Sequence, residues 1–377
     1  MESVLVLRNV NKSFGGKAVL TGVNLTVEKG DFLVLYGRPG TGKSTVVRLI
    51  MGLDEADSGQ IELRGAAAGG LKIGERNIGY VPQSFALFPE KTVRENIVYP
   101  LTFGRFDRRV VDERVATMAT MLHIEHLLDK RPTQLSGGEK QRVAIARGLA
   151  KPTDFYILDD PLAGLDFKLR ERLVDDLREL HEAMQATLIY CASDSLEALS
   201  LARTLVVLDE GTVLDVGSPG AVYDAPGHLD TMAAIGFPEV NILEASVRSR
   251  DAAGSLVVQT KLFEVGLPPN DHNSGSLSDI RIGIRPESIR LSREGASTHG
   301  SARNHVVEIH GSVNLVEDLG AEMIVHFATS GGELRILLRH DEATDSIEGI
   351  DAVYVDPRDM LIFGGTAMAF LGNGGQT

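Results

Sequence analysis

The segment between residues 37 and 45 combines glycines, a lysine and hydroxyl side chains at a spacing that suits phosphate binding. Glycines let consecutive backbone N–H groups point into one concavity, where the start of a helix adds partial positive charge. We expect Lys43 to neutralise the outer phosphates of a nucleotide and the Ser44 hydroxyl to ligate Mg²⁺. The pattern predicts a polyphosphate cradle rather than a plain glycine-rich turn, formed by Gly37, Arg38, Pro39, Gly40, Thr41, Gly42, Lys43, Ser44 and Thr45.

A second glycine-rich helix start lies about a hundred residues further on. Ser136 is a good N-cap, and Gly137 and Gly138 leave backbone N–H groups unobstructed at the start of the helix that follows. The chain is therefore predicted to carry two phosphate-binding surfaces.

Two adjacent carboxylates, Asp159 and Asp160, end an apolar run at 155–158 that is typical of a strand. A carboxylate at a strand end can hold the Mg²⁺ shell, and we assign that role to Asp159. The alternative, an acidic N-cap for the next helix, fits Asp160 better than Asp159. Cys191 lies in another apolar run and is expected to be a buried structural thiol.

The elements that must position these residues follow from the pattern of apolar side chains. Residues 32–36 are predicted to form a buried strand and 45–50 a helix, whereas 4–10 and 23–27 alternate like strands of a half-buried antiparallel sheet. Helical spacing continues from 93 to 128, which predicts an inserted helical subdomain extending to about residue 150.

Two further segments, around Phe14 and over residues 84–89, each fit two structural roles. Phe14, before a Gly-Gly turn, is either an adenine-stacking aromatic or a core residue. The apolar loop 84–89 after Gln83 either folds back on the core or lines a groove for a partner's helix.

Composition limits the classes of protein that fit. The chain has 377 residues, 43 % of them hydrophobic, which suggests two or three domains. A net charge of −14 argues against nucleic-acid binding, and a single cysteine excludes an intrachain disulfide. We see no signal peptide and no membrane span, so we expect a cytoplasmic protein whose membrane role comes through a partner.

The character of the chain changes near residue 240. Beyond it, short strands at 256–258, 280–284, 323–327 and 334–338 alternate with Gly, Ser and Asp turns, which is typical of a small all-β barrel. We therefore predict an α/β P-loop domain over residues 1–239 and a β domain over 240–377.

Together these segments resemble the ATP-binding subunits of ABC transporters over almost the whole chain. The family's motifs match in order at the phosphate loop, at Gln83 in the Q-loop, at the signature 135–142, at the Walker B strand ending in Asp159, and at the D-loop 163–166. Residues 235–241, 283–287 and 316–322 narrow the resemblance to importers of sugars, polyols and glycerol phosphate with an OB-type regulatory domain.

The resemblance implies roles for individual residues. Phe14 corresponds to the adenine-stacking aromatic, Gln83 senses Mg²⁺ and the permease, and Asp166 belongs to the D-loop. Two subunits close head to tail, so that ATP on the phosphate loop of one is capped by the signature of the other. The signature residues that would act across this interface are Leu135, Ser136, Gly137, Gly138, Glu139 and Gln141.

Two positions depart from the family pattern around the outermost phosphate. Asp160 replaces the glutamate that positions the attacking water, and Ser193 replaces the switch histidine. The shorter carboxylate is withdrawn, and a misplacement of about 1 Å can cost about 10²-fold in rate. Serine carries no positive charge for the transferring phosphoryl group. We therefore expect ATP binding with weak hydrolysis at this chain's own site.

The partners expected from the resemblance are transmembrane permease subunits and, indirectly, an extracytoplasmic solute-binding protein. The intact signature suggests a heterodimer with a second, consensus-like ATPase subunit, with a slow homodimer as the alternative. The expected location is the cytoplasmic face of the inner membrane. A non-transport ABC ATPase of the repair or translation type is the rival function; the acidic composition argues against it. The β domain is expected to add regulation.

Overall fold

The computed structural model describes residues 2–250, 256–267, 279–291, 306–341, 347, 349–365 and 368–373. The chain divides into two compact units, Met1–Gly220 and Ala221–Thr377. The β domain predicted over 240–377 lies wholly within the second unit. None of the helices in the described part of the chain is both long and apolar enough to cross a membrane.

The centre of the first unit is a mainly parallel sheet with the strand order β10-β9-β3-β8-β7-β6. Strands β6, β7, β8, β3 and β9 run parallel, and β10 closes the sheet as an antiparallel partner of β9. The sheet comprises β3 (Phe32–Tyr36), β6 (Ile78–Val81), β7 (Phe155–Asp159), β8 (Leu188–Ala192), β9 (Thr204–Asp209) and β10 (Thr212–Gly217). The predicted strand at 32–36 is confirmed, and all its side chains are buried.

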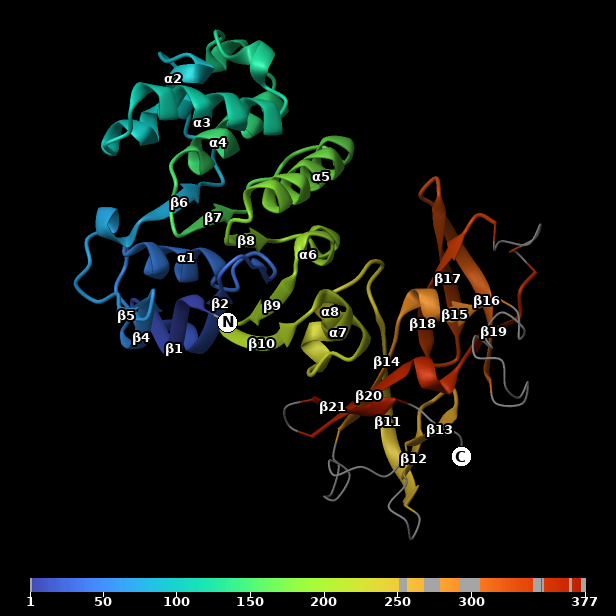
Figure 1. Cartoon of the computed structure of the whole chain (residues 1–377). Coiled ribbons are helices and arrows are strands. Elements are labelled where there is room, and N and C mark those ends of the chain that lie inside the picture. The colour runs from blue at the N-terminus through green and yellow to red at the C-terminus, as the bar shows by residue number, and fades with distance from the viewer. Residues whose placement is uncertain are drawn as a thin grey trace. The chain divides into compact units, whose positions relative to one another are not determined.

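A second, antiparallel sheet has the order β2-β1-β4-β5 (Figure 1). Its inward side chains share one apolar core with helix α1 and the central sheet, so the helix that follows the phosphate loop packs against both sheets. The predicted half-buried antiparallel sheet is thus confirmed. The elements are β1 (Ser3–Phe14), β2 (Lys17–Glu28), α1 (Lys43–Met51), β4 (Ser58–Leu63) and β5 (Ala66–Ala67), followed by the short turn η1 (Ile73–Arg76).

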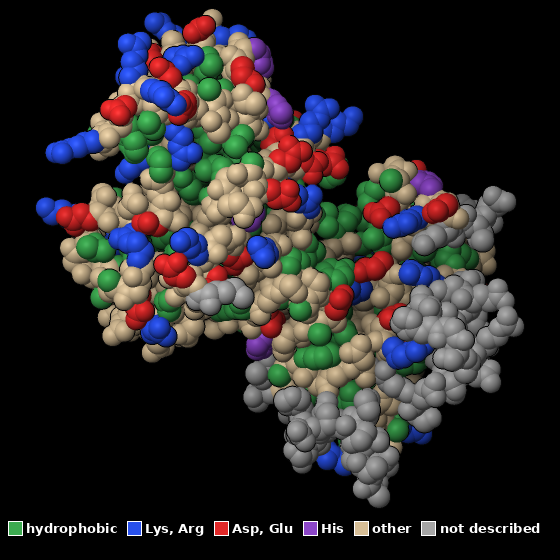
Figure 2. Space-filling view, viewed as in Figure 1, with side chains coloured by type: hydrophobic (Ala, Val, Ile, Leu, Met, Phe, Trp, Pro, Cys, Tyr) green, Lys and Arg blue, Asp and Glu red, His purple; other side chains and the backbone are tan. Residues whose placement is uncertain are grey.

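Helices between β6 and β7 form the inserted part, drawn above the sheet in Figure 1. Buried side chains such as Val115, Met118 and Ala119 line one side of α3, as the apolar spacing requires. In the view of Figure 2, basic and acidic side chains are interspersed over these helices. The elements are α2 (Val93–Val98), η2 (Tyr99–Phe103), α3 (Arg108–Met121), η3 (Glu125–Leu127), η4 (Pro132–Gln134) and α4 (Gly137–Ala150).

Helices α5 (Phe167–Met184) and α6 (Ser195–Leu201) complete the first unit, and each begins at an aspartate N-cap. Asp166 accepts a hydrogen bond from Leu169 N at 3.0 Å and is the cap of α5. The alternative that Asp160 caps this helix is therefore wrong, because the helix begins only after the turn that contains Gly164. Asp160 instead lies in that turn with a left-handed φ of 47°.

The second unit is built from two antiparallel sheets, ordered β13-β12-β11-β14-β20-β21 and β15-β19-β16-β17-β18. Their facing side chains form one apolar core, which confirms the predicted all-β, OB-type domain. After α8 (Leu229–Ala234), the strands are β11 (Asn241–Arg250), β12 (Leu256–Gln259), β13 (Glu264–Leu267), β14 (Ile280–Ile284), β15 (Ile289–Arg290), β16 (Val307–Asp318), β17 (Glu322–Thr329), β18 (Gly332–Arg339), β19 (Ala352–Val355), β20 (Met360–Gly364) and β21 (Ala369–Asn373).

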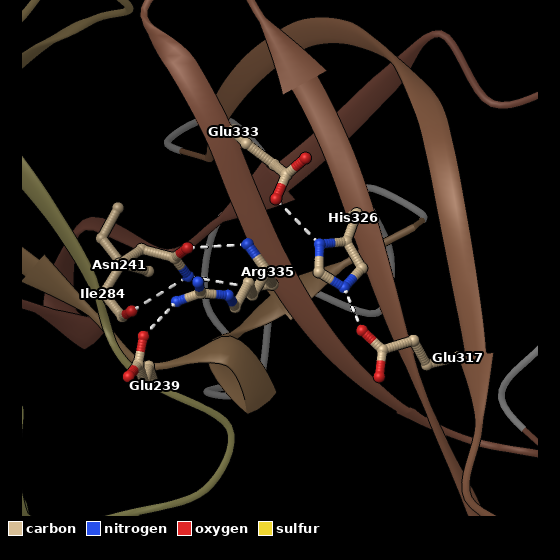
Figure 3. A network of polar contacts seen from close by, with 7 residues as sticks. All are labelled: Glu239, Asn241, Ile284, Glu317, His326, Glu333 and Arg335. Carbon is tan, nitrogen blue, oxygen red and sulfur yellow. Dashed lines mark hydrogen bonds and ion pairs between the residues drawn. The ribbon is translucent and has the colours of Figure 1, made fainter.

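A polar network crosses the outer face of β16, β17 and β18 (Figure 3). The ring nitrogens of His326 lie 2.7 Å from Glu317 Oε1 and 2.8 Å from Glu333 Oε1. Both nitrogens can donate only when the imidazole is protonated, and hydrogen bonds to these glutamates raise the pKa of His326. Nearby, the Asn241 side chain bonds the backbone of Arg335 and so ties β11 to β18.

Candidate functional site

The predicted site residues follow neighbouring parallel strands. The phosphate loop follows β3 and Ser193 follows β8. Asp159 ends β7 with Asp160 directly after it, and Gln83 follows β6. Because β3, β8, β7 and β6 are successive strands of the sheet, their carboxyl ends meet at one edge. This is the edge at which open α/β sheets bind ligands.

The phosphate loop has the backbone that its glycines allow. Gly42 is the N-cap of α1 with φ 106°, and a Cβ built there would lie 2.7 Å from Leu20 Cδ2. A Cβ on Gly37 would lie 2.4 Å from the carbonyl oxygen of Leu208. The loop is therefore closely enclosed at these two positions, and side chains there would displace it.

Lys43 lies within the loop that it is expected to serve. Its ammonium group donates to the carbonyl oxygens of Gly37 at 2.5 Å and Arg38 at 3.2 Å, and its side chain is buried. Burial lowers the pKa of Lys43, while nearby Asp159 and Asp160 oppose that shift. A cation held by loop carbonyls is well placed to exchange one of them for a phosphate oxygen.

Asp159 is a partly buried carboxylate with one hydroxyl donor, Tyr80, at 3.3 Å. Burial raises the pKa of Asp159, and the neighbouring Asp160 adds to that shift. The ionised form of Asp159 is thus disfavoured, and a bound cation would stabilise it. Together with the Ser44 hydroxyl and the Gln83 amide, Asp159 offers the oxygen donors that Mg²⁺ prefers, so the residues fit this ion.

The described residues contain no group of three or more His, Cys, Asp or Glu side chains that could hold a metal ion. Only one member of the predicted Mg²⁺ set, Asp159, belongs to those residue types. An ion held here would draw its remaining ligands from phosphate and water, as Mg²⁺ at nucleotide sites usually does.

Asp160 and Ser193, the two departures from the family pattern, contact each other. Ser193 Oγ donates a hydrogen bond of 2.8 Å to Asp160 Oδ2. The backbone N–H of Asp160 donates to the carbonyl oxygen of Cys191 at 3.0 Å, which fixes the start of the turn. One oxygen of the carboxylate is thus occupied by a side chain rather than directed at solvent.

The signature surface is ordered by a capping box at the start of α4. Ser136 Oγ and Ser136 N both donate to Glu139 Oε2 at 2.7 Å, while Glu139 N donates back to Ser136 Oγ at 3.4 Å. These hydrogen bonds lower the pKa of Glu139. Ser136 is confirmed as an N-cap, whereas Leu135 and Gln141 are buried beneath the surface and Gln141 is fully enclosed.

The apolar loop after Gln83 is held by two polar side chains, the partly buried Arg147 and the buried Asn96. Arg147 donates to the carbonyl oxygens of Ala86 at 2.5 Å and Phe85 at 3.1 Å. Asn96 accepts from Phe88 N at 2.9 Å. A groove of about 330 Å³ runs beside the loop, with Phe88 and Arg147 in its wall. The loop thus packs on the helices and also borders a groove.

Several contributors were not predicted from the sequence. The Tyr80 hydroxyl donates to Asp159. Arg170 donates one hydrogen bond of 3.3 Å to the backbone carbonyl oxygen of Leu165 in the D-loop and another of 3.1 Å to the Asp194 carboxylate. Tyr190 donates to the buried Glu197, and burial raises the pKa of Glu197 to about 7. No spacing rule connects these residues, because their contacts form only when separate strands and helices are brought together.

Comparison with known families gives two matches along the chain. Residues 20–163 match the ABC transporter family, and residues 282–363 match the TOBE domain. Among solved structures, cbiO1 from Clostridium perfringens, part of the ABC transporter complex cbiONQ, covers 59 % of this chain with a TM-score of 0.56 and 28 % identity; the match spans 91 % of its own length. A bacterial ABC transporter cassette solved as a dimer covers 57 % of this chain, and 98 % of its own length, with a TM-score of 0.52 and 30 % identity.

Whole-chain relatives extend the similarity through both units. The sn-glycerol-3-phosphate import ATP-binding protein UgpC of Cereibacter sphaeroides is 36 % identical over 88 % of this chain and 89 % of its own length. The maltose/maltodextrin import ATP-binding protein MalK of Yersinia pestis is 33 % identical over 92 % of this chain and 91 % of its own. The lactose transport ATP-binding protein LacK of Rhizobium radiobacter is 33 % identical over 89 % of this chain and 90 % of its own.

Proposed function

Because the chain belongs to the ABC transporter family of ATP-binding subunits, we propose that it couples ATP to the import of a carbohydrate or polyol, such as a sugar, glycerol or glycerol phosphate. The observation that carries the proposal is the convergence of the phosphate loop, Asp159 and Gln83 at one sheet edge. UgpC and MalK are import ATP-binding proteins and LacK is a transport ATP-binding protein, which favours import over the repair or translation alternative.

The bound ion in this proposal is Mg²⁺, held by Ser44 and Asp159 with Gln83 nearby. It would neutralise phosphate charge during phosphoryl transfer. Lys43 would bind the outer phosphates, and the backbone N–H groups at the start of α1 would orient them. Phe14, 47 % exposed at the end of β1, would stack on the adenine.

Hydrolysis at this chain's own site is proposed to be weak. The Asp160 carboxylate is one methylene shorter than glutamate, and one of its oxygens accepts the Ser193 hydroxyl. It is therefore poorly placed to orient an attacking water. Ser193 in turn offers no positive charge to the transferring group.

The intact signature favours a heterodimer in which Ser136, Gly137 and Gly138 complete the active site of a second ATPase subunit. A slow homodimer is the second candidate. In either assembly, permease subunits would dock on the groove beside residues 85–88, and the protein would act as a peripheral subunit on the cytoplasmic face of the inner membrane. A solute-binding protein would take part indirectly.

Purification from the native membrane with a tag on this chain tests the assembly. We expect permease subunits and a second, glutamate-bearing ATPase to copurify in equal amounts with it. Recovery with permease subunits alone would leave the homodimer. Recovery with ribosomal or DNA-repair proteins and no permease would contradict the import function.

A further inference from the structure

Phe14 is placed by the last residues of β1, where the sheet is incomplete. β1 pairs with β2 as far as Phe14, but its pairing with β4 ends at Asn11. The register with β2 also shifts on both sides of Lys12. Among the described residues, no strand therefore pairs with the last residues of β1 on that side, and the ring of Phe14 is half exposed at their end.

Asp57 supplies the missing partner. Its Oδ2 accepts hydrogen bonds from Ser13 N at 2.6 Å and from Ser13 Oγ at 2.5 Å. Its own backbone N–H donates to the carbonyl oxygen of Asn11 at 2.9 Å. A single aspartate thus continues the edge of the sheet for the residues that precede Phe14.

The same carboxylate fixes a cation against the aromatic ring. Asp57 Oδ1 accepts from the ammonium of Lys12 at 3.1 Å, and that ammonium lies over the Phe14 ring, 5.0 Å from its centroid. The Lys12 side chain is only 15 % exposed. A cation held over one face of a ring restricts the ring and leaves the opposite face for another partner.

We propose that Lys12 and Asp57 are positioning residues for nucleotide binding: they hold the Phe14 ring in the orientation in which a purine base stacks on it. The inference rests on the proposed stacking role of Phe14 and extends it to two residues outside the phosphate loop. Asp57 orders the backbone through Ser13, and Lys12 orders the ring itself.

The test separates the base from the phosphates by calorimetric titration of the full chain with Mg-ATP and with inorganic triphosphate. Phe14→Ala is expected to weaken Mg-ATP binding about tenfold, because stacking of a base on an aromatic ring raises the binding constant by about a factor of ten. Lys12→Met and Asp57→Ala should each weaken Mg-ATP about twofold to fivefold. None of the three should change the affinity for triphosphate.

A double-mutant cycle distinguishes positioning from general loss of stability. In the Phe14→Ala background, Asp57→Ala should have no further effect on Mg-ATP affinity. Glu62→Ala is the matched control. Glu62 of β4 forms an ion pair of 3.2 Å with Arg8, which lies in β1 like Lys12 but away from Phe14. Thermal melts of every variant check the fold.

The outcomes separate this inference from the function it rests on. If Phe14→Ala leaves Mg-ATP affinity unchanged while Lys43→Ala abolishes it, the stacking role itself is wrong. If Phe14→Ala weakens Mg-ATP but Lys12→Met and Asp57→Ala do not, the positioning role is wrong. An equal loss of triphosphate affinity in Asp57→Ala would also overturn it, since the aspartate would then support the loop as a whole.

Discussion

Restoring the glutamate at position 160 and the histidine at position 193 should convert this chain's own site into a fast one. The Asp160 carboxylate is one methylene too short, a displacement of roughly 1 to 1.5 Å, and about 1 Å is worth about 10²-fold in rate. A donor or cation at the transferring group is worth about a further 10²-fold. We expect Asp160→Glu with Ser193→His to raise turnover by about 10³-fold or more.

The structure also predicts a cost and a dependence between the two changes. Position 160 has a left-handed φ of 47°, which aspartate tolerates better than glutamate, so Asp160→Glu should lower stability by about 1 kcal/mol. In the Asp160→Glu single variant, Ser193 loses its 2.8 Å partner. The double variant should therefore exceed the product of the single effects on turnover.

Phosphate release by the purified chain is the assay, measured over a range of protein concentrations. If each site is completed by the signature of another subunit, as proposed, two copies of the purified chain must associate, so the rate per chain should rise with concentration. Lys43→Ala in the restored background is the control that assigns the gain to this phosphate loop. If the unaltered chain already matches the double variant, and Asp160→Asn leaves its rate unchanged, the reasoning about this pair is refuted.

Three other predictions concern separate parts of the chain. Gly42→Ala should reduce Mg-ATP affinity at least tenfold in calorimetry, because its Cβ would meet Leu20 at 2.7 Å and φ is 106°; unchanged affinity would contradict the enclosed-loop geometry. Arg285→Ala should destabilise the second unit by about 3 kcal/mol in chemical denaturation, since this buried guanidinium donates to two backbone carbonyls; a loss under 1 kcal/mol would show that they find other donors. His326→Gln should lower the free energy of unfolding most between pH 4.5 and 6.5. The folded state raises the pKa of His326, so the stability that the protonated histidine contributes is complete below pH 6.5 and is lost as pH rises through its folded pKa, while above pH 4.5 Glu333 is ionised and can pair with it. A loss of stability that does not depend on pH would exclude the charged pair.

The fold was predictable wherever local pattern and burial agree. The strand β3 and the helix α3 follow from apolar runs and helical spacing, and the cap at Ser136 follows from residue type alone. The cap of α5 was not predicted, because Asp160 and Asp166 both precede the helix and have the same preference. Only the turn around Gly164 decides between them.

The site was predictable in its members but not in their contacts. Sequence order places the phosphate loop, Asp159 and Ser193 at strand ends, and a parallel sheet brings such ends together. The hydrogen bond from Ser193 to Asp160 depends on the left-handed turn at 160, and the contact between Lys12 and Asp57 depends on where β4 stops pairing with β1. Neither contact can be predicted from the spacing of these residues in the sequence.

The role proposed for the signature requires no rearrangement of its backbone, because a capping box already holds Ser136 at the start of α4. Ser136 Oγ donates to Glu139 at 2.7 Å, and the same carboxylate also accepts from Ser136 N. Turning the hydroxyl toward a partner's phosphate would exchange a hydrogen bond to an ionised carboxylate for one to a charged phosphate oxygen, and each contributes about 1.5 to 3 kcal/mol. The exchange is close to neutral in free energy, and the carboxylate keeps its backbone donor throughout. In the proposed heterodimer, Glu139 would hold the serine in position until a second subunit presents its nucleotide, as expected if the signature serves the partner's site while this chain's own site hydrolyses ATP slowly.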